Sequence, residues 1–392
     1  WKKRAVNQII TKDRMEKKHQ KHAKLTRPGY GEFHRQEWAI IGATCGRIQE
    51  LSAKLIAALQ GHYQLAYVDA DHAAGDEAEQ MPVAGSAAVY TDKINYHQYN
   101  FSDELNAFHR RPLFQHTDGV LVNGNHFRAK RQIVVLDPKK EESLSRKLDR
   151  LTDVALILTT EEQDKPYTFL ADHLGEHKPV MMPLGDINGI IQWLRAQLTA
   201  ARAPLYGLVL AGGKSQRMGE DKGLINYHGQ PQREYLAEQL SGVCKEVYFS
   251  LRPGQEAPAS DKVIRDSFAG LGPFGAILSA FREQPNAAWL VVACDLPMLD
   301  QAGLQYLAQK RNTSKLATAY HNPATGWPDP LVTIWEPRAY PVLLQFLTQG
   351  YSCPRKVLIN SDTAVIEAQN PQILLNANSP EERQEVERLL RR

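Results

Sequence analysis

Residues 210–222 read LAGGKSQRMGEDK and directly follow a short apolar segment. An apolar run that leads into a Gly-Gly pair predicts a buried strand ending in a tight turn. Gly212 and Gly213 can adopt positive φ angles and let backbone N–H groups approach an anion closely. Arg217 and Lys222 add a planar guanidinium and a compact ammonium, which bind phosphate oxygens in different ways. The segment therefore predicts a phosphate-binding loop at the carboxyl end of a strand.

Short apolar runs alternate with amphipathic helical patterns on both sides of this loop. Apolar strands separated by helices are typical of mostly parallel sheets covered on both faces, so the predicted fold class is α/β with two three-layer sheets. The expected strands are Trp38–Ile41, Leu65–Val68, Gly119–Val122, Ile133–Leu136, Val154–Leu158, Val180–Met182, Leu205–Leu210, Val247–Phe249, Ala288–Ala293, Ala317–Tyr320 and Leu331–Trp335. The expected helices include Leu51–Leu59, Ile187–Leu198, Tyr235–Leu240, Pro273–Phe281 and Pro380–Leu390.

The 392 residues fit two domains of ordinary size, with a boundary near residues 199–204, where a helical pattern ends in TAARAP. We expect a basic tail over residues 1–28, one α/β domain over 29–200 and a second over 201–392. The tail holds ten Lys and Arg residues against two acidic ones, so the net charge of +3 divides into +8 and −5. A poorly ordered tail is favoured over a nucleic-acid arm. Met15 is a candidate for the natural first residue.

Composition excludes several classes of protein. Hydrophobic residues make up 43% and charged residues 23%, as in globular proteins. No apolar run approaches the roughly 18 residues of a membrane-spanning helix, and the start lacks the apolar core of a secretory signal. The four cysteines form no C-x-x-C pair, which fits a cytoplasmic protein without structural zinc. His173 and His177 have a spacing that can share a metal, but exposed polar histidines are the favoured interpretation.

Three later segments also carry candidate ligand-binding groups. Asp295 follows an apolar strand, and a carboxylate beside a triphosphate needs a cation such as Mg²⁺ between them, the alternative being a turn residue. Asp266 is either a ligand contact or a cap, and Gly272 opens a helix whose N-terminus faces a nucleotide. Asn376 and Asn378 share one face of an extended segment, so both amides point to one ligand or make turns before a capping sequence.

The loop at 210–222 resembles the signature L-A-G-G-x-S-x-R-M-G-x-D-K of the MobA-like nucleotidyltransferases, the molybdenum cofactor guanylyltransferases, and has every fixed position. The resemblance extends over residues 204–392. Further landmarks are segments 263–266, 270–276, 291–298 and 374–382. It implies a Rossmann-like nucleotidyltransferase fold, GTP as donor, molybdopterin as acceptor, Mg²⁺ as metal, and cofactor-biosynthesis proteins or molybdoenzymes as partners.

The same resemblance implies roles for individual residues. The catalytic residues would be Arg217, Lys222 and Asp295, with Asp295 also holding the metal. The nucleotide would contact Leu210, Ala211, Gly212, Gly213, Lys222, Asp266 and Gly272. The acceptor would contact Asn376, Asn378 and Arg355.

Two departures from the family pattern fall near the expected base-binding region. Leu251 stands where an Asn is expected, and Gly275 and Ala276 are exchanged relative to the family's G-P-L-A-G loop. These departures leave open a nucleotidyl transfer from an NTP other than GTP, for example a cytidylyl transfer from CTP to the same pterin. The Gly212–Gly213 pair favours guanine, since relatives of the cytidylyl kind often have Ala at the first position. A non-catalytic nucleotide-binding adaptor is the alternative of a different class.

The first half opens with a strand, a glycine turn and a helical pattern at residues 38–49, similar to the P-loop of MobB-like proteins. Ile41 replaces its first glycine, Arg47 its phosphate-binding Lys, and Ile48 its metal-ligating Ser or Thr. NTP hydrolysis is therefore not expected here. A docking or pterin-holding role and a purely structural role both remain open. In the second half, Leu208 likewise stands where a Walker A loop would need its first glycine.

Overall fold

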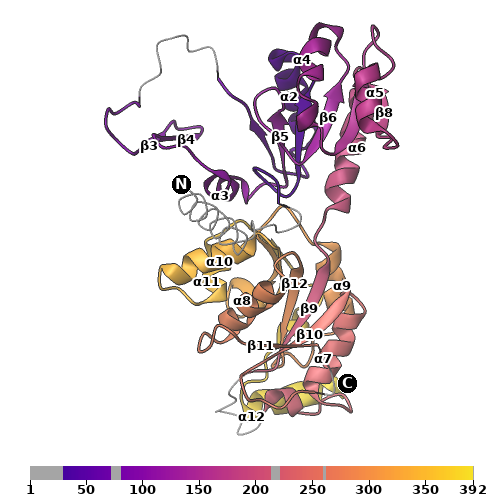
Figure 1. Cartoon of the computed structure of the whole chain (residues 1–392). Helices are drawn as coiled ribbons and strands as arrows, with labels where there is room; N and C mark the ends of the chain where they lie inside the picture. Colours follow the sequence, from indigo (N-terminus) through magenta and orange to yellow (C-terminus); the bar gives the residue numbers. More distant parts are fainter. Residues whose placement is uncertain (1–29, 72–80, 213–220, 259–261, 392) are drawn as a thin grey trace, which may run out of the picture. The chain divides into compact units, whose positions relative to one another are not determined.

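The computed structural model describes residues 30–71, 81–212, 221–258 and 262–391 and divides the chain into two compact units (Figure 1). The first unit comprises the described residues up to 55 together with 66–114 and 119–190. The second comprises 56–65, 115–118 and 191 onward. The predicted loop residues Gly213 and Arg217, and the basic tail over 1–28, lie outside the described residues.

The first unit contains a six-stranded sheet. Its order is β2 (Leu65–Val68), β5 (Gly119–Asn123), β1 (Glu37–Ile41), β6 (Arg131–Val135), β7 (Val154–Thr159) and β8 (Val180–Pro183). The pairs from β5 to β8 are all parallel. Every residue of β1 and β5 is buried, so both faces of the sheet are covered, as the apolar runs predict.

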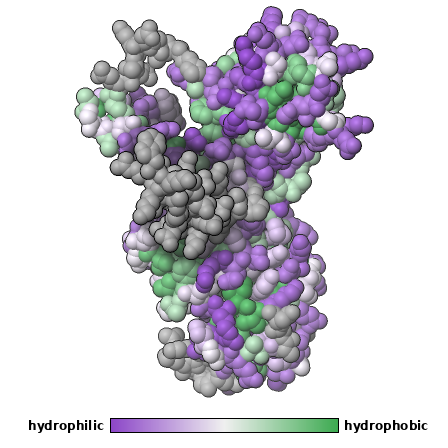
Figure 2. Space-filling model, viewed as in Figure 1, coloured by the Kyte–Doolittle hydropathy of each residue, from purple (hydrophilic) through white to green (hydrophobic). Residues whose placement is uncertain are grey.

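The helices of this part are α2 (Cys45–Leu59), α3 (Ala107–Arg110), α4 (Glu141–Ser145), α5 (Thr168–Leu174) and α6 (Ile187–Ala200), with 3₁₀ turns η1 (Arg111–Phe114), η2 (Pro138–Lys140) and η3 (Leu148–Arg150). An antiparallel hairpin of β3 (Ala88–Asp92) and β4 (His97–Phe101) was not expected from the sequence. The ring of Tyr99 stacks on Phe101 and lies at a tilt to Tyr90, and all three rings stay largely exposed. The hairpin forms part of the pale and green area at the left of Figure 2. The sequence of these two strands does not predict them, because neither strand has a fully buried face that would require alternating apolar residues.

The second unit is built on a seven-stranded sheet. Its order is β11 (Val263–Arg265), β10 (Glu246–Leu251), β9 (Leu205–Leu210), β12 (Ala288–Ala293), β14 (Trp327–Trp335), β13 (Ala317–Asn322) and β15 (Thr363–Ile366). All neighbours are parallel except β14, which is antiparallel to both β12 and β13. A four-residue turn joins β13 to β14, and so short a connection can join only antiparallel strands.

Helices cover both faces of this sheet, so the unit has three layers (Figure 1). The helices are α7 (Gln232–Ser241), α8 (Pro273–Glu283), α9 (Gln301–Gln309), α10 (Ala339–Thr348), α11 (Pro354–Ile359) and α12 (Pro380–Leu390). Leu290 faces a buried cluster with α7 and α9, whereas the adjacent Trp289 and Val291 face one with α8 and α10. The α/β prediction is confirmed, as is each predicted strand and helix to within a few residues at its ends, except that α2 begins at Cys45 rather than Leu51.

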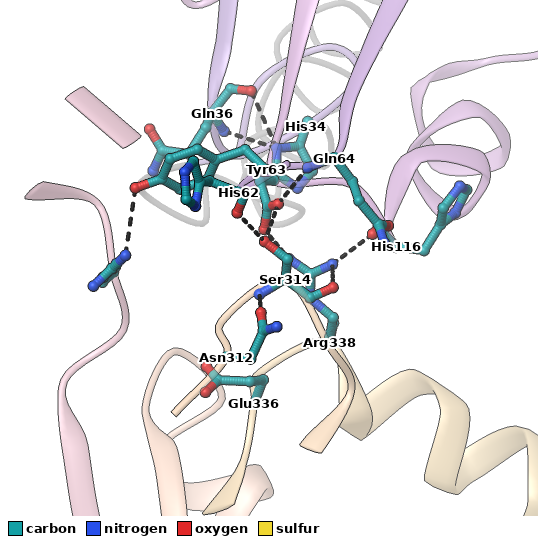
Figure 3. A network of polar contacts seen from close by, with 12 residues as sticks. His34, Gln36, His62, Tyr63, Gln64, His116, Asn312, Ser314, Glu336 and Arg338 are labelled. Carbon is teal, nitrogen blue, oxygen red and sulfur yellow. Dashed lines mark hydrogen bonds and ion pairs between the residues drawn. The ribbon is translucent and has the colours of Figure 1, made fainter. Parts of the chain in front are cut away.

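Two segments from the first half of the sequence pack within the second unit. Ser314 donates a 2.6 Å hydrogen bond to Oδ2 of Asp118 and a second hydrogen bond, 3.1 Å long, to the carbonyl of His62. Arg338 pairs with Asp118 and donates to the carbonyl of His116 (Figure 3). These contacts explain why residues 56–65 and 115–118 belong to this unit.

Candidate functional site

Lys222 lies at the centre of the candidate site, in the 3₁₀ turn η4 (Lys222–Leu224). Its Nζ donates a 2.6 Å hydrogen bond to Oδ1 of Asn378 and lies 3.8 Å from Oδ2 of Asp295. Lys222 follows β9 in the sequence, Asp295 follows β12, and Asn378 precedes α12. Because β9 and β12 are parallel neighbours, their carboxyl ends meet at one edge of the sheet. The structure thus assembles a predicted ammonium, carboxylate and amide at the edge where open α/β sheets bind ligands.

Asp295 is held firmly and is mostly buried. Its backbone carbonyl accepts a 2.8 Å hydrogen bond from the N–H of Ala377, and its side chain is only 17% exposed. Burial raises the pKa of the Asp295 carboxyl, while the Lys222 ammonium opposes that rise and the charges of Asp329 and Glu382 add to it. Its Oδ1 is buried without a hydrogen-bond partner among the described residues. An oxygen of this kind is costly to bury unless a cation or donor joins it.

Asn378 is positioned by the start of α12. The Ser379 hydroxyl caps this helix by accepting a hydrogen bond of 3.2 Å from the Glu382 N–H, and Glu382 Oε2 accepts one of 2.6 Å from the Asn378 N–H. The predicted capping sequence is therefore confirmed, and the Asn378 amide contacts Lys222 as well. Asn376 is half-buried and makes no side-chain hydrogen bond within the described ranges.

A glutamine that sequence analysis did not single out braces the end of the phosphate loop. Gln255 Nε2 donates to the carbonyl of Ala211 at 2.7 Å and to Oδ2 of Asp221 at 3.1 Å. Asp221 in turn caps η4 by accepting a hydrogen bond of 2.9 Å from the Gly223 N–H. Gln255 therefore joins the two described ends of the loop, immediately before Lys222.

Asp266 lies on the opposite side of β9 from Asp295. The N–H of Ala211 donates to the carbonyl of Ser250 at 3.1 Å, and the Ser250 hydroxyl donates to Oδ1 of Asp266 at 2.8 Å. Burial raises the pKa of Asp266, although the Ser250 hydrogen bond and nearby Arg252 oppose it. Adjacent strand ends thus bring Asp266 to the same sheet edge as Ala211, with Leu210, the last residue of β9, paired with Ser250.

The departures from the family pattern have structural reasons. Leu251 is fully buried in the core, so its side chain is unavailable to a base. A Cβ on Gly275 would lie 2.2 Å from the carbonyl oxygen of Phe268, so only glycine fits there. Gly272 caps α8 with a φ of 55°, a conformation that L side chains rarely adopt.

Arg355 is not brought to this cluster. It lies on α11, and Figure 1 draws α11 and α12 at opposite ends of the second unit. Within the described residues, Lys222 contacts Asn378 and Asp295, and Arg355 takes no part in these contacts.

The first unit has a glycine turn at the predicted P-loop position, with Gly42 at a φ of 87°. Ile48 is fully buried and packs in the core, so it cannot ligate a metal. Arg47 is committed to an ion pair with Asp137, with 3.0 Å between Nη1 and Oδ2. The structure therefore supports the prediction that this loop lacks the groups that NTP hydrolysis requires.

The described residues offer limited protein ligands for a metal. They contain no cluster of three or more His, Cys, Asp or Glu side chains suited to hold one. The exposed rings of His173 and His177 each contact a backbone carbonyl through Nε2, at 2.8 Å from Leu151 and 2.7 Å from Val154.

Comparison with known proteins shows which family the chain belongs to. A model described as the MobA-like NTP transferase domain matches residues 207–365. The chain is 32% identical over 185 residues to the probable molybdenum cofactor guanylyltransferase of Trichormus variabilis, covering 45% of this chain and 88% of that protein. The chain belongs to the MobA-like NTP transferase family. The matched region of this MobA-like chain includes Lys222, Asp266 and Asp295, whereas Asn378 lies beyond it.

A second relative is the molybdenum cofactor biosynthesis bifunctional protein of Synechocystis sp., 35% identical over 196 residues. The match covers 49% of the MobA-like chain and 56% of that relative, so it spans little more than half of the relative's length. Among solved structures, molybdopterin-guanine dinucleotide biosynthesis protein A from Archaeoglobus fulgidus matches 47% of this chain and 97% of its own, with 20% identity and a TM-score of 0.40. Within the part of the chain that the structure describes, no helix combines the length and apolarity needed to cross a bilayer.

Proposed function

We propose that this chain transfers GMP from GTP to the phosphate of molybdopterin with Mg²⁺, giving the guanine dinucleotide cofactor and pyrophosphate. One observation carries the proposal: Lys222 meets both Asp295 and Asn378 at the carboxyl ends of β9 and β12. An ammonium beside a partly buried carboxylate suits a triphosphate together with its cation. Membership of the MobA-like family supports nucleotidyl transfer, and the names of the relatives support the guanine and molybdopterin assignments.

The proposed reaction is a displacement at phosphorus. A phosphate oxygen of the acceptor bonds to the α-phosphorus of GTP, the bond to the β-phosphate oxygen breaks, and pyrophosphate leaves. This chemistry needs positioning and charge neutralisation more than covalent help from the protein. Lys222 would bring its positive charge to the phosphate oxygens while its hydrogen bond to Asn378 holds the ammonium in place. Gly212, Gly213 and Arg217 would hold the rest of the triphosphate.

Asp295 would hold the metal in this scheme. Its buried, unpartnered Oδ1 is the kind of hard oxygen ligand that Mg²⁺ prefers, so the residues present fit the ion. A bound Mg²⁺ would neutralise charge that develops on the phosphates. Burial raises the pKa of Asp295, and a cation beside the carboxylate would lower it again, so a bound cation would favour the ionised form.

Asp266 is the proposed contact for the base. Its carboxylate is fixed by Ser250, one strand away from Ala211, and a guanine edge offers two adjacent N–H donors to such a group. Leu210 and Gly272 would border the same nucleotide. Because Leu251 is a core residue, base selection would rest on Asp266 rather than on an amide at that position.

For the acceptor, Asn376 is the better-placed candidate, since it lies two residues from Asn378 and its amide has no described hydrogen bond. Arg355 stays a weaker proposal. We further propose that residues 29–200 form a MobB-like domain that docks or holds the pterin and does not hydrolyse NTP, beside a catalytic domain over 201–392. The setting would be the cytoplasm, and the protein partners would be cofactor-biosynthesis proteins or molybdoenzymes.

The decisive experiment measures pyrophosphate release by the full chain with molybdopterin, Mg²⁺ and each NTP in turn. We expect release with GTP and little with ATP, CTP or UTP. Release with CTP alone would replace the guanylyl assignment by a cytidylyl one. Tight nucleotide binding without release for any NTP would instead identify a nucleotide-binding adaptor.

A further inference from the structure

A second group of reactive side chains lies in the first unit, at the turn where a P-loop would bind phosphate. Cys45 is the exposed first residue of α2, and its Sγ lies 3.2 Å from Nε2 of His126. The side-chain amide of Asn125 also donates toward this sulfur at 3.6 Å. A thiol within hydrogen-bond reach of an imidazole is the arrangement by which proteins activate a cysteine.

A carboxylate approaches the same nitrogen of the imidazole that contacts the thiol. Asp69 Oδ1 lies 3.8 Å from His126 Nε2 and accepts a 2.9 Å hydrogen bond from the amide of Asn123, while Oδ2 accepts one of 2.6 Å from the Tyr67 hydroxyl. Burial opposes ionisation of Asp69, yet these hydrogen bonds and the charge of His126 leave its pKa below the ordinary value. An ionised carboxylate beside the ring stabilises the imidazolium that forms when the thiol gives up its proton.

We propose that Cys45 is a nucleophilic thiol activated by His126, and that this site takes soft electrophiles, with small disulfides as its chemical class of partner. In the exchange, the Cys45 sulfur attacks one sulfur of the disulfide. A new S–S bond forms, the old one breaks, and the released thiolate takes up the proton that Cys45 gave to His126. Cys45 is oxidised and the leaving sulfur is reduced, so no other oxidant is needed.

The surroundings of Cys45 contain charges of both signs. Lys147, after α4, lies close enough to interact electrostatically with Cys45, and the N-terminus of the 15-residue helix α2 favours an anion. The carboxylate of Asp69, which approaches the same His126 nitrogen, opposes a negative sulfur. Arg47, on α2, is paired with Asp137. His126 is the acid or base that contacts the sulfur directly, so the proposal assigns the activation of Cys45 to this imidazole.

The test follows reaction of the full chain with 4,4′-dithiodipyridine, with each cysteine resolved by peptide mass spectrometry. Cys353, the other exposed cysteine, is the internal standard. At pH 6.5 we expect Cys45 to react about tenfold faster than Cys353, or more, because rate follows the thiolate fraction. The His126→Gln variant should lower the rate of Cys45 about tenfold. At pH 9.5, where exposed thiols are ionised without help, the two proteins should differ little.

Matched controls separate activation from a change in folding or access. His109→Gln removes an exposed histidine of the same unit and should leave the Cys45 rate unchanged. Cys244 and Cys294 are buried and should stay unreactive in every variant that is folded. If Cys45 reacts no faster than Cys353 at pH 6.5, or if His126→Gln slows it equally at both pH values, the proposal is wrong.

Discussion

Nζ of Lys222 lies 2.6 Å from Oδ1 of Asn378, although 156 residues separate the two in the sequence. The hydrogen bond fixes a flexible lysine at the edge of the sheet before any nucleotide arrives, while Asp295 stands 3.8 Å away on the neighbouring strand end. Because the lysine side chain is already ordered, it loses less conformational entropy when the substrate binds. The geometry thus assigns different tasks to three residues that meet only in the folded chain.

Removing the ammonium should affect the reaction far more than the fold. We predict that Lys222→Ala lowers kcat/KM by about 100-fold or more, because it deletes a cation directed at the developing phosphate charge. Pyrophosphate release with GTP and molybdopterin measures the loss. Lys245→Ala, which removes an exposed lysine of the same unit, should keep the normal rate. Equal rates for the two variants would contradict the role given to Lys222.

Asn378 should act by positioning Lys222. We predict that Asn378→Ala lowers kcat/KM by about tenfold, since the ammonium survives but loses its neutral partner. The double variant with Lys222→Ala should be little worse than Lys222→Ala alone, because the two act as one unit. Asn360→Ala, on an exposed amide after α11, is the matched control. Additive losses in the double variant would show that Asn378 works independently of Lys222.

Asp295→Asn should reduce activity by about 100-fold or more while stabilising the ligand-free protein. Burial raises the pKa of Asp295, so its ionisation in the folded state costs stability as the pH rises above the ordinary Asp value of about 4. The variant should therefore unfold at a higher temperature than the parent at pH 7. That advantage should shrink as the pH falls toward 4, where the carboxyl is protonated. Thermal unfolding without nucleotide or metal measures both effects.

A control for this trade-off is Asp362→Asn, because Asp362 is largely exposed and pairs with Lys315 at the surface. It should change neither activity nor unfolding temperature appreciably. If Asp295→Asn destabilises the protein at pH 7, the carboxylate is better satisfied than its buried Oδ1 indicates.

Asp266 should set the choice of base. Inosine triphosphate lacks the exocyclic amine of GTP, so a carboxylate that accepts from this amine should favour GTP. We predict that Asp266→Asn reduces the ratio of kcat/KM for GTP to that for ITP by about tenfold. Steady-state rates with both nucleotides test this, and an unchanged ratio would place the base elsewhere. The Ser250→Ala variant, which removes the hydroxyl that fixes Asp266, should have a smaller effect in the same direction.

Gly275 should be irreplaceable for stability. In the Gly275→Ala variant the new Cβ would lie 2.2 Å from the carbonyl oxygen of Phe268, which is a severe clash. We therefore predict that the free energy of unfolding falls by about 1–3 kcal/mol. Gly61→Ala adds the same methyl group where nothing lies within 4 Å and should be nearly neutral. Urea denaturation of both variants makes the comparison, and equal stability would mean that the 268–275 turn adapts freely.

Much of this architecture is already present in local sequence. The apolar runs at residues 205–210 and 288–293 predict their strands because both faces are buried. Ser379 and Glu382 predict the start of α12, since capping depends on neighbours within one turn. The loss of P-loop function can also be predicted from the sequence, because Ile48 has no oxygen that could bind a metal in any fold. Local chemistry of this kind needs no knowledge of distant contacts.

Only the tertiary structure decided which distant side chains meet. No spacing indicates that Asn378 reaches Lys222, that Gln255 joins the two ends of the phosphate loop, or that Cys45 lies beside His126. These contacts depend on strand order, since parallel neighbours bring together chain segments separated by long crossovers. The sequence by itself determined most of the strands, the cap of α12 and the chemical groups available. The order of the strands in each sheet determined which of those groups share a site.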